Sequence, residues 1–289
     1  MSKYIITTDS ASDLPKDYEK KENLYVQPLF YNFDDQVYGG KNDLDYKDFY
    51  NRMRQGEMPV TNAIIQEEMT NGLRPFLKEG YDILHLAFSS GLSSTCQNAF
   101  LAAKELMEEF PDRKITVVDT YAASLGEGLL VHKALQLKKQ GKSMEEVTQW
   151  VEDNRDHLCH LFTVDDLFHL HRGGRVSKTV AVIGTIVNIK PVLHVDNAGE
   201  LKMLKTVRGR KKSLINLVDR MEILCKGYED QNDIVFISHG DCLEDAQFVA
   251  DLVKQRLGIQ NFVIDYVSPT IGAHSGPGTI ALFFMGKEK

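Results

Sequence analysis

Five hydroxyl side chains and a glycine stand between an apolar run and a helical pattern, in Ser89-Ser90-Gly91-Leu92-Ser93-Ser94-Thr95. The run Ile83–Phe88 predicts a buried strand, and apolar residues after Thr95 recur at helical spacing. A helix N-terminus offers unpaired N–H groups and a positive dipole end, so hydroxyls there either cap the helix or help to hold an anion. One cap uses one hydroxyl, and the surplus favours binding of an anion or a carbonyl group.

A serine-hydrolase site fits these residues poorly. The nucleophile elbow requires G-x-S-x-G, and Gly91-Leu92-Ser93-Ser94-Thr95 lacks the second glycine. A second hydroxyl-bearing stretch, Ser238-His239-Gly240-Asp241, places its three polar residues too close in sequence to form a triad. We interpret it as a strand end followed by a turn.

Glycines dominate the segment Ile271–Thr279, which we predict to be a loop. Such a loop either makes a tight connection or lets another group approach the backbone. His274 and Ser275 within it are candidate hydrogen-bond donors to an anion. The glycine spacing fits neither the Rossmann nor the P-loop motif, so a nucleotide site is not indicated.

Two histidines precede a glycine pair in the segment His169–Ser177. On a helix, His169 and His171 point apart because of their spacing, which disfavours a metal site. Arg172 and Arg175 flank the glycines, and we expect them to position the joint between domains or to contact an anion.

A basic stretch occupies residues 208–212 in an otherwise acidic chain. It is either a solvated loop and helix start or a docking surface for an acidic partner. If it docks a partner, the candidate residues are Arg208, Arg210 and Lys211.

Composition sets the broad class of the protein. The chain of 289 residues carries a formal net charge of −7, which argues against nucleic acid or an anionic membrane as a partner of the whole surface. No signal-peptide pattern begins it, and no apolar run approaches the roughly 20 residues of a membrane-spanning helix. Four scattered cysteines indicate reduced thiols, and we expect a cytoplasmic protein with neither a metal nor a disulfide framework.

The order of predicted elements indicates an α/β protein of two domains. Residues 1–160 alternate strands and helices, which predicts a doubly wound parallel sheet. Residues 161–289 contain a predicted hairpin around Asp196-Asn197-Ala198-Gly199 and further helices, which predicts a largely antiparallel sheet. Within the first domain, Leu24–Phe30 is predicted as one strand and Ser143-x-x-Glu146 as a capping box.

Several segments together resemble the DegV family of bacterial fatty-acid-binding proteins. The resemblance runs from about residue 4 to residue 286. It rests on these blocks, which occur in family order: Thr8–Pro15, Ser89–Asn98, Val118-Asp119-Thr120, Arg172–Ser177, Ile189-Lys190-Pro191 and His274–Gly278. The family implies two α/β domains with a long-chain fatty acid such as hexadecanoate between them, no cofactor, and no catalytic centre of its own. A separate fatty-acid kinase is implied as the partner, which makes the acyl phosphate for phospholipid synthesis.

The resemblance also implies a carboxylate site. The family's carboxylate-binding threonine and serine match Thr61 and Ser93, and its closing-loop histidine and glycine-pair arginine match His274 and Arg172. Two neighbouring positions depart from the family pattern, since Asn62 stands where a serine is usual and Ser94 where a glycine is usual. We include Asn62 and Ser94 in the predicted site.

Two other functions stay open, one at the same site and one at the basic stretch. The chain could be a phosphoryl- or acyl-transferring enzyme with His274 as its general base. It could instead be an interaction protein that acts through residues 208–212.

Overall fold

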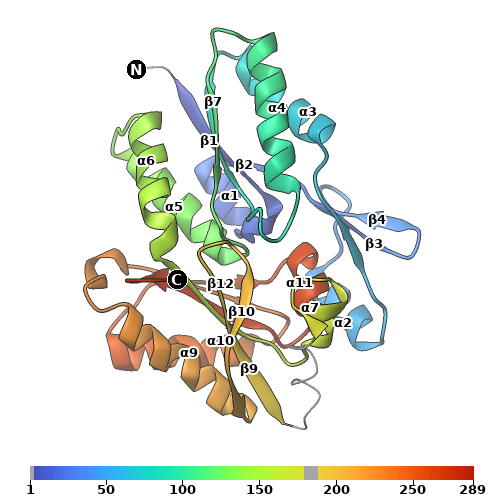
Figure 1. Ribbon diagram of the computed structural model, residues 1–289, viewed down its shortest axis with the longest axis vertical. Helices are drawn as coiled ribbons and strands as arrows, with labels where there is room; N and C mark the ends of the chain where they lie inside the picture. The colour runs from blue at the N-terminus through green and yellow to red at the C-terminus, as the bar shows by residue number, and fades with distance from the viewer. Residues whose placement is uncertain (1–2, 179–187) are drawn as a thin grey trace.

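Two sheets and the helices between and around them form the frame of the protein (Figure 1). The computed structural model describes residues 3–178 and 188–289. The first sheet is parallel throughout, in the order β2-β1-β6-β7. Its strands are β1 (Tyr4–Asp9), β2 (Tyr25–Gln27), β6 (Asp82–Ala87) and β7 (Ile115–Asp119).

The second sheet has six strands in the order β10-β9-β8-β13-β11-β12. Every neighbouring pair is antiparallel except β11 and β12. The strands are β8 (Leu158–Thr163), β9 (Ile189–Val195), β10 (Leu201–Arg208), β11 (Val235–His239), β12 (Phe262–Tyr266) and β13 (Ile280–Met285). A parallel sheet followed by a mixed, mostly antiparallel sheet confirms the predicted fold class.

Helices cover both faces of both sheets. The helices α3 (Gln66–Lys78) and α4 (Thr95–Glu109) pack on one face of the first sheet, and α9 (Arg210–Leu224) and α10 (Leu243–Leu257) on the outer face of the second. The strand β6 is buried along its whole length, as a parallel strand covered on both faces should be.

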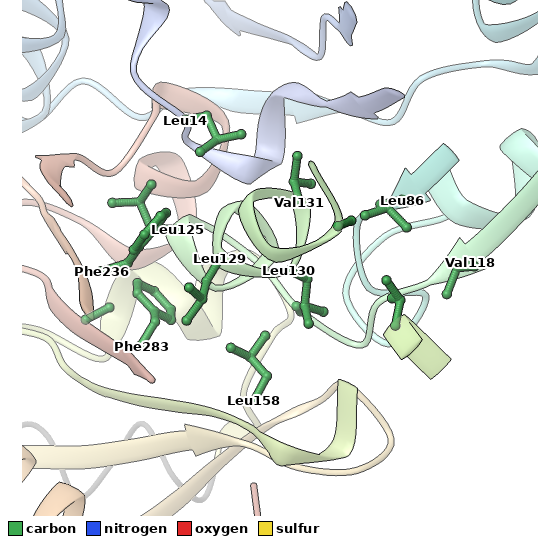
Figure 2. Close-up of a cluster of buried hydrophobic side chains, with 14 of the residues drawn as sticks. Leu14, Leu86, Val118, Leu125, Leu129, Leu130, Val131, Leu158, Phe236 and Phe283 are labelled. Carbon is green, nitrogen blue, oxygen red and sulfur yellow. The ribbon is translucent and has the colours of Figure 1, made fainter. Parts of the chain in front are cut away.

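The helix α5 (Leu125–Lys139) joins the two halves into one core. It lies between the sheets and, with α6 (Met144–Asn154), covers the other face of the first one. Leu86 from the first sheet and Phe236 and Phe283 from the second belong to the same buried cluster as the leucines of α5 (Figure 2). The capping box predicted for α6 is confirmed, because Ser143 and Glu146 each bond the other's backbone N–H.

The boundary at residue 160 remains a prediction. The strand β8 crosses it, yet β8 pairs only within the second sheet. The chain therefore changes sheet in the 3-10 turn Arg155–His157, just before β8 begins.

A small third sheet corrects the strand that we predicted over Leu24–Phe30. That segment contains the end of β2 and the start of β3 (Phe30–Phe33), which belong to different sheets. Pro28 separates them and has no N–H to continue a ladder. The strand β3 pairs with β4 (Gln36–Tyr38) and β5 (Val60–Asn62), and α2 (Tyr46–Arg54) packs beside them around an aromatic cluster.

The hydroxyl of Tyr50 on α2 fixes this small unit to the second half of the chain. It donates to the carbonyl of Val267 at 2.8 Å, and the tyrosine is fully buried. The β5 strand at the edge of the unit is thereby held against the segment that follows β12.

Candidate functional site

A cavity of about 390 Å³ lies beyond the carboxyl ends of β6 and β7, against the second sheet. Open α/β sheets bind ligands at these strand ends, and the volume lies within the roughly 300–1,000 Å³ typical of small-ligand sites. Much of the wall is apolar, and its largest members include Phe88, Leu92, Phe162, Leu201, Ile271 and Phe283. All six predicted ligand-binding residues line this one cavity: Thr61, Asn62, Ser93, Ser94, Arg172 and His274.

Thr61 and His274 meet at one wall of the cavity. Thr61 lies on β5, and its Oγ1 is 2.8 Å from Nε2 of His274. Burial, followed by the charges of Arg175 and Arg172, lowers the pKa of His274 to about 3. The imidazole is therefore neutral at physiological pH. A general base works best when its pKa lies near the operating pH, so this environment counts against His274 as one.

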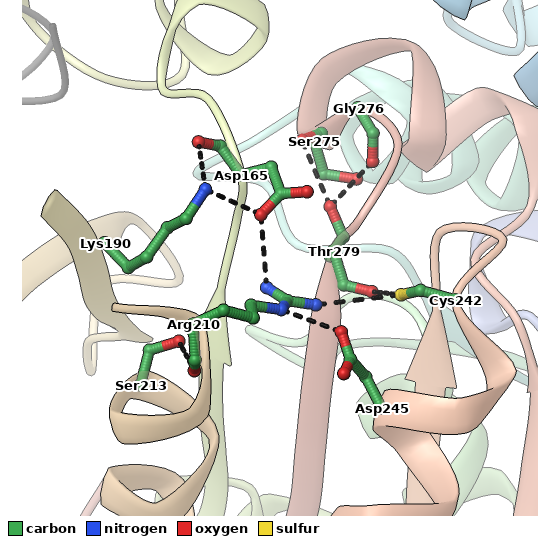
Figure 3. Close-up of polar contacts among 9 residues, drawn as sticks. All are labelled: Asp165, Lys190, Arg210, Ser213, Cys242, Asp245, Ser275, Gly276 and Thr279. Carbon is green, nitrogen blue, oxygen red and sulfur yellow. Dashed lines mark hydrogen bonds and ion pairs between the residues drawn. The ribbon is translucent and has the colours of Figure 1, made fainter. Parts of the chain in front are cut away.

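The segment that carries His274 is a helix, not the loop we predicted. The helix α11 (Pro269–Ser275) begins with a proline at its first position, where the missing N–H costs nothing. It ends at Gly276, whose φ is +80°. The hydroxyl of Thr279 donates to the carbonyls of Ser275 and Gly276 and closes the helix end (Figure 3).

Ser93 and Thr95 pair at the start of α4. The two hydroxyl oxygens are 2.9 Å apart, and the N–H of Thr95 donates to Ser93 Oγ at 3.2 Å. The N–H of Ile64 donates to Thr95 Oγ1 at 3.3 Å, and Asn98 Nδ2 donates to the Ile64 carbonyl at 2.8 Å. These bonds tie the segment just after Thr61 to the loop that carries Ser93.

The remaining hydroxyls of the loop have other roles. Ser89 is buried and donates to the carbonyl of Gly199 in the hairpin between β9 and β10, at 2.9 Å. Ser94 occupies the N-cap position without making a side-chain cap bond, and it is exposed. The loop is therefore partly structural, and Ser93 is the hydroxyl that both lines the cavity and is held by a neighbour.

Two arginines brace the cavity from the segment around α7 (Phe168–Arg172). Arg172 donates through Nη2 to the carbonyls of Pro59 and Ala273, at 3.0 and 2.9 Å. Arg175 donates through Nε and Nη2 to the Leu92 carbonyl, at 3.1 and 2.8 Å. Both line the cavity and bond backbone carbonyls there, and their contact with an anion stays a prediction.

Asn62 is a weaker candidate than its neighbour Thr61. Its side chain is exposed, and Nδ2 donates to Asn32 Oδ1 at 2.7 Å across the small sheet. The contact links β3 and β5 at the border of the cavity.

The predicted docking residues differ in solvent exposure and in ion pairing. Arg210 is partly buried, with Nε donating to Asp245 at 2.8 Å and Nη1 3.6 Å from Asp165 (Figure 3). Arg208, at the end of β10, and Lys211 are exposed. Arg210 is paired with two carboxylates, so of the three predicted docking residues only Arg208 and Lys211 remain candidates.

Residues that sequence reasoning did not select also border the cavity. Ser124 and His160 line it, and the Ser124 hydroxyl bonds the buried carboxyl group of Asp13. Burial raises the pKa of Asp13 to about 7. Thr95 was inside the hydroxyl segment but was not singled out, although its place two residues after Ser93 allows their side chains to bond. No sequence signal marks His160, which reads as one residue of a buried strand.

The fold and the cavity together define a ligand-binding α/β protein whose site lies between two sheets. Within the described residues, no helix has the length and apolar content needed to cross a membrane. The chain belongs to the DegV family. The family model, which describes an uncharacterised protein of the DegV family, matches residues 3–287.

Relatives and solved structures agree over the full length. A DegV domain-containing protein of Clostridium perfringens is 44% identical over 100% of this chain and 99% of its own. A solved DegV family protein of Thermus thermophilus, described for its fatty acid binding, is 29% identical with a TM-score of 0.86, covering 99% of this chain and 100% of its own. DegV of Bacillus subtilis, described as a fatty acid binding protein, is 26% identical with a TM-score of 0.84 at the same coverage.

Proposed function

We propose that this protein binds a long-chain fatty acid, with the carboxylate at Thr61 and Ser93 and the tail along the apolar wall of the cavity. The observation that carries the proposal is the placement of two hydroxyls, each held by a neighbouring side chain, on the border of one largely apolar cavity. The fatty acid binding described for the relatives from Thermus thermophilus and Bacillus subtilis supports it.

The tail supplies most of the binding free energy in this arrangement. Each buried methylene contributes about 0.8 kcal/mol, so roughly fourteen contribute on the order of 11 kcal/mol before ordering costs. Micromolar binding or tighter is therefore reachable with modest head-group contacts. The hydroxyls then fix the direction of the chain in the cavity.

Native mass spectrometry of the protein purified from cells tests this proposal. We expect an adduct with the mass of a long-chain fatty acid, and uptake of hexadecanoic acid after the protein has been stripped of lipid. Protein that carries no lipid and takes up none when offered would refute the proposal.

The finer part of the proposal is that the bound acid is presented to a separate kinase, which forms the acyl phosphate. The exposed Arg208 and Lys211 are the candidate docking residues. A double reversal, Arg208→Glu with Lys211→Glu, should lower acyl-phosphate formation in the presence of the kinase and leave fatty-acid binding unchanged. The double reversal Lys78→Glu with Lys104→Glu, at two exposed lysines of α3 and α4, makes the same change of charge and is the matched control.

Two results would count against the finer part. Kinase coupling that survives the double reversal would exclude this docking surface. Acyl-phosphate formation by the chain alone, abolished in a His274→Ala variant, would favour the enzyme hypothesis.

A further inference from the structure

The hydrogen-bond partners of Thr95 determine the direction of its hydroxyl. Thr95 is fully buried, and its Oγ1 accepts the N–H of Ile64. Among the described residues, the only acceptor in reach of the Thr95 proton is Ser93 Oγ, at 2.9 Å. A buried hydroxyl proton without an acceptor is costly, so Thr95 donates to Ser93.

Ser93 is left with one way to contact a ligand. A hydroxyl oxygen has two lone pairs and one proton. Both lone pairs of Ser93 Oγ accept from Thr95, one from its N–H and one from its hydroxyl. The proton of Ser93 is therefore free to be donated into the cavity that the residue lines.

His274 fixes the direction of one hydrogen bond of Thr61. The neutral imidazole carries one proton, and its Nδ1 is buried without a hydrogen-bond partner in the described part of the chain. Gly173 packs directly against Nδ1, where an added Cβ would lie 2.0 Å away. A proton on Nδ1 would lack an acceptor, whereas a bare Nδ1 suits the nearby positive charges of Arg172 and Arg175.

The proton therefore sits on Nε2 and is donated to Thr61 Oγ1, at 2.8 Å. Thr61 then keeps its own hydroxyl proton for a ligand, together with the second lone pair of its oxygen. Two hydroxyls from different elements, one on β5 and one before α4, both face the cavity as donors.

We propose that Thr95 and His274 are positioning residues that hold Ser93 and Thr61 as donors, so that the site selects an ionised carboxylate over an uncharged head group on the same tail. An ionised carboxylate only accepts hydrogen bonds, and bonds to it are stronger than those between neutral groups. A fatty alcohol forms only the weaker bonds between neutral groups here, and Ser93 has no lone pair left to accept the alcohol proton. The inference rests on the proposed function and adds the two residues that make the site selective.

The ratio of two affinities tests this inference. Dissociation constants for hexadecanoic acid and for hexadecan-1-ol are measured on the lipid-stripped full chain at pH 8. The Thr95→Val variant removes the hydroxyl that orients Ser93, and we expect the preference for the acid to fall by about tenfold, with little change in alcohol affinity. Thr95→Ser restores the hydroxyl and should restore the preference. A merely loosened site would weaken both ligands together and leave the ratio unchanged.

A matched control and a second pair of variants complete the design. Thr70 on α3 is buried, its hydroxyl has no partner among the described residues, and it does not line the cavity, so Thr70→Val should leave the ratio as it is. His274→Gln keeps an N–H donor near the position of Nε2 and should retain the preference, whereas His274→Phe should lose it. The His274 pair decides the question independently if Thr95→Val does not fold.

The two proposals fail in different ways. If the wild type prefers the acid and the ratio stays constant in both Thr95→Val and His274→Phe, the polarity inference is overturned and fatty-acid binding stands. If the wild type takes up neither ligand, the proposed function is overturned, and the inference with it.

Discussion

Arg175 donates through two nitrogens to the single carbonyl oxygen of Leu92, at 2.8 and 3.1 Å. The two residues are 83 positions apart in sequence, and Leu92 immediately precedes Ser93. The guanidinium of Arg175 thus fixes the backbone of the hydroxyl loop next to Ser93.

Replacing Arg175 should loosen the hydroxyl loop. Arg175→Lys keeps the charge but cannot reach one oxygen with two fixed N–H groups. We expect a loss of about 1.5–3 kcal/mol in the free energy of unfolding, together with weaker fatty-acid binding. Urea denaturation measures the first effect. Arg256 pairs with Asp219 on the surface, and Arg256→Lys should change stability by no more than about 0.5 kcal/mol. Equal effects at the two sites would contradict this account.

Removing both head-group hydroxyls should weaken binding without abolishing it. In a Thr61→Ala, Ser93→Ala double variant, each lost charge-assisted hydrogen bond should cost about 1.5–3 kcal/mol of binding free energy. The apolar wall is unchanged, so the acid should still bind through its tail. Calorimetric titration with hexadecanoic acid measures the loss, and Thr61→Ser, which keeps its hydroxyl, serves as the control. Unchanged affinity in the double variant would refute the head-group assignment.

The two glycines after α7 should respond differently to substitution. A Cβ on Gly173 would lie 2.0 Å from His274 Nδ1, so Gly173→Ala must displace the imidazole and should cost about 1–3 kcal/mol of stability. Gly174 faces open space but has a φ of +74°, a conformation that asparagine tolerates. Gly174→Asn should therefore be nearly neutral. Thermal unfolding compares the two variants, and the reverse order of stability would show that the His274 contact has been misread.

Stability should fall on acidification partly because of His274. Its pKa is lowered to about 3 in the folded protein, so between about pH 6.5 and pH 3 the unfolded chain binds the extra proton. Unfolding is therefore favoured as pH falls through that window. At pH 5 this residue accounts for about 2 kcal/mol of lost stability. Urea denaturation at pH 7 and pH 5 should show a correspondingly smaller loss in His274→Gln. Parallel losses in wild type and variant would contradict the assignment.

Local patterns in the sequence were sufficient for most elements and for the fold class. The buried strand predicted over Ile83–Phe88 is β6 to within one residue at each end, and the helical spacing after Thr95 is α4, because those signals lie within each segment. Prediction failed where the signal was ambiguous. The three glycines of Ile271–Thr279 led to the prediction of a loop where the short helix α11 lies. The continuous β-forming stretch Leu24–Phe30 led to the prediction of one strand, although the chain changes sheet at Pro28.

The sequence by itself determined that a segment rich in hydroxyl side chains follows a buried strand. Its likeness to the DegV family pointed to Ser93, Thr61 and His274. Only the tertiary structure decided what each of them contacts. Thr61 and His274 are 213 positions apart, and no local pattern encodes a 2.8 Å contact between a strand of the small sheet and α11. The same holds for the hydrogen bond between Ile64 and Thr95 and for the ion pairs of Arg210 with Asp165 and Asp245. Hydrogen-bond direction depends on which partners surround a buried group, and packing of distant segments supplies those partners.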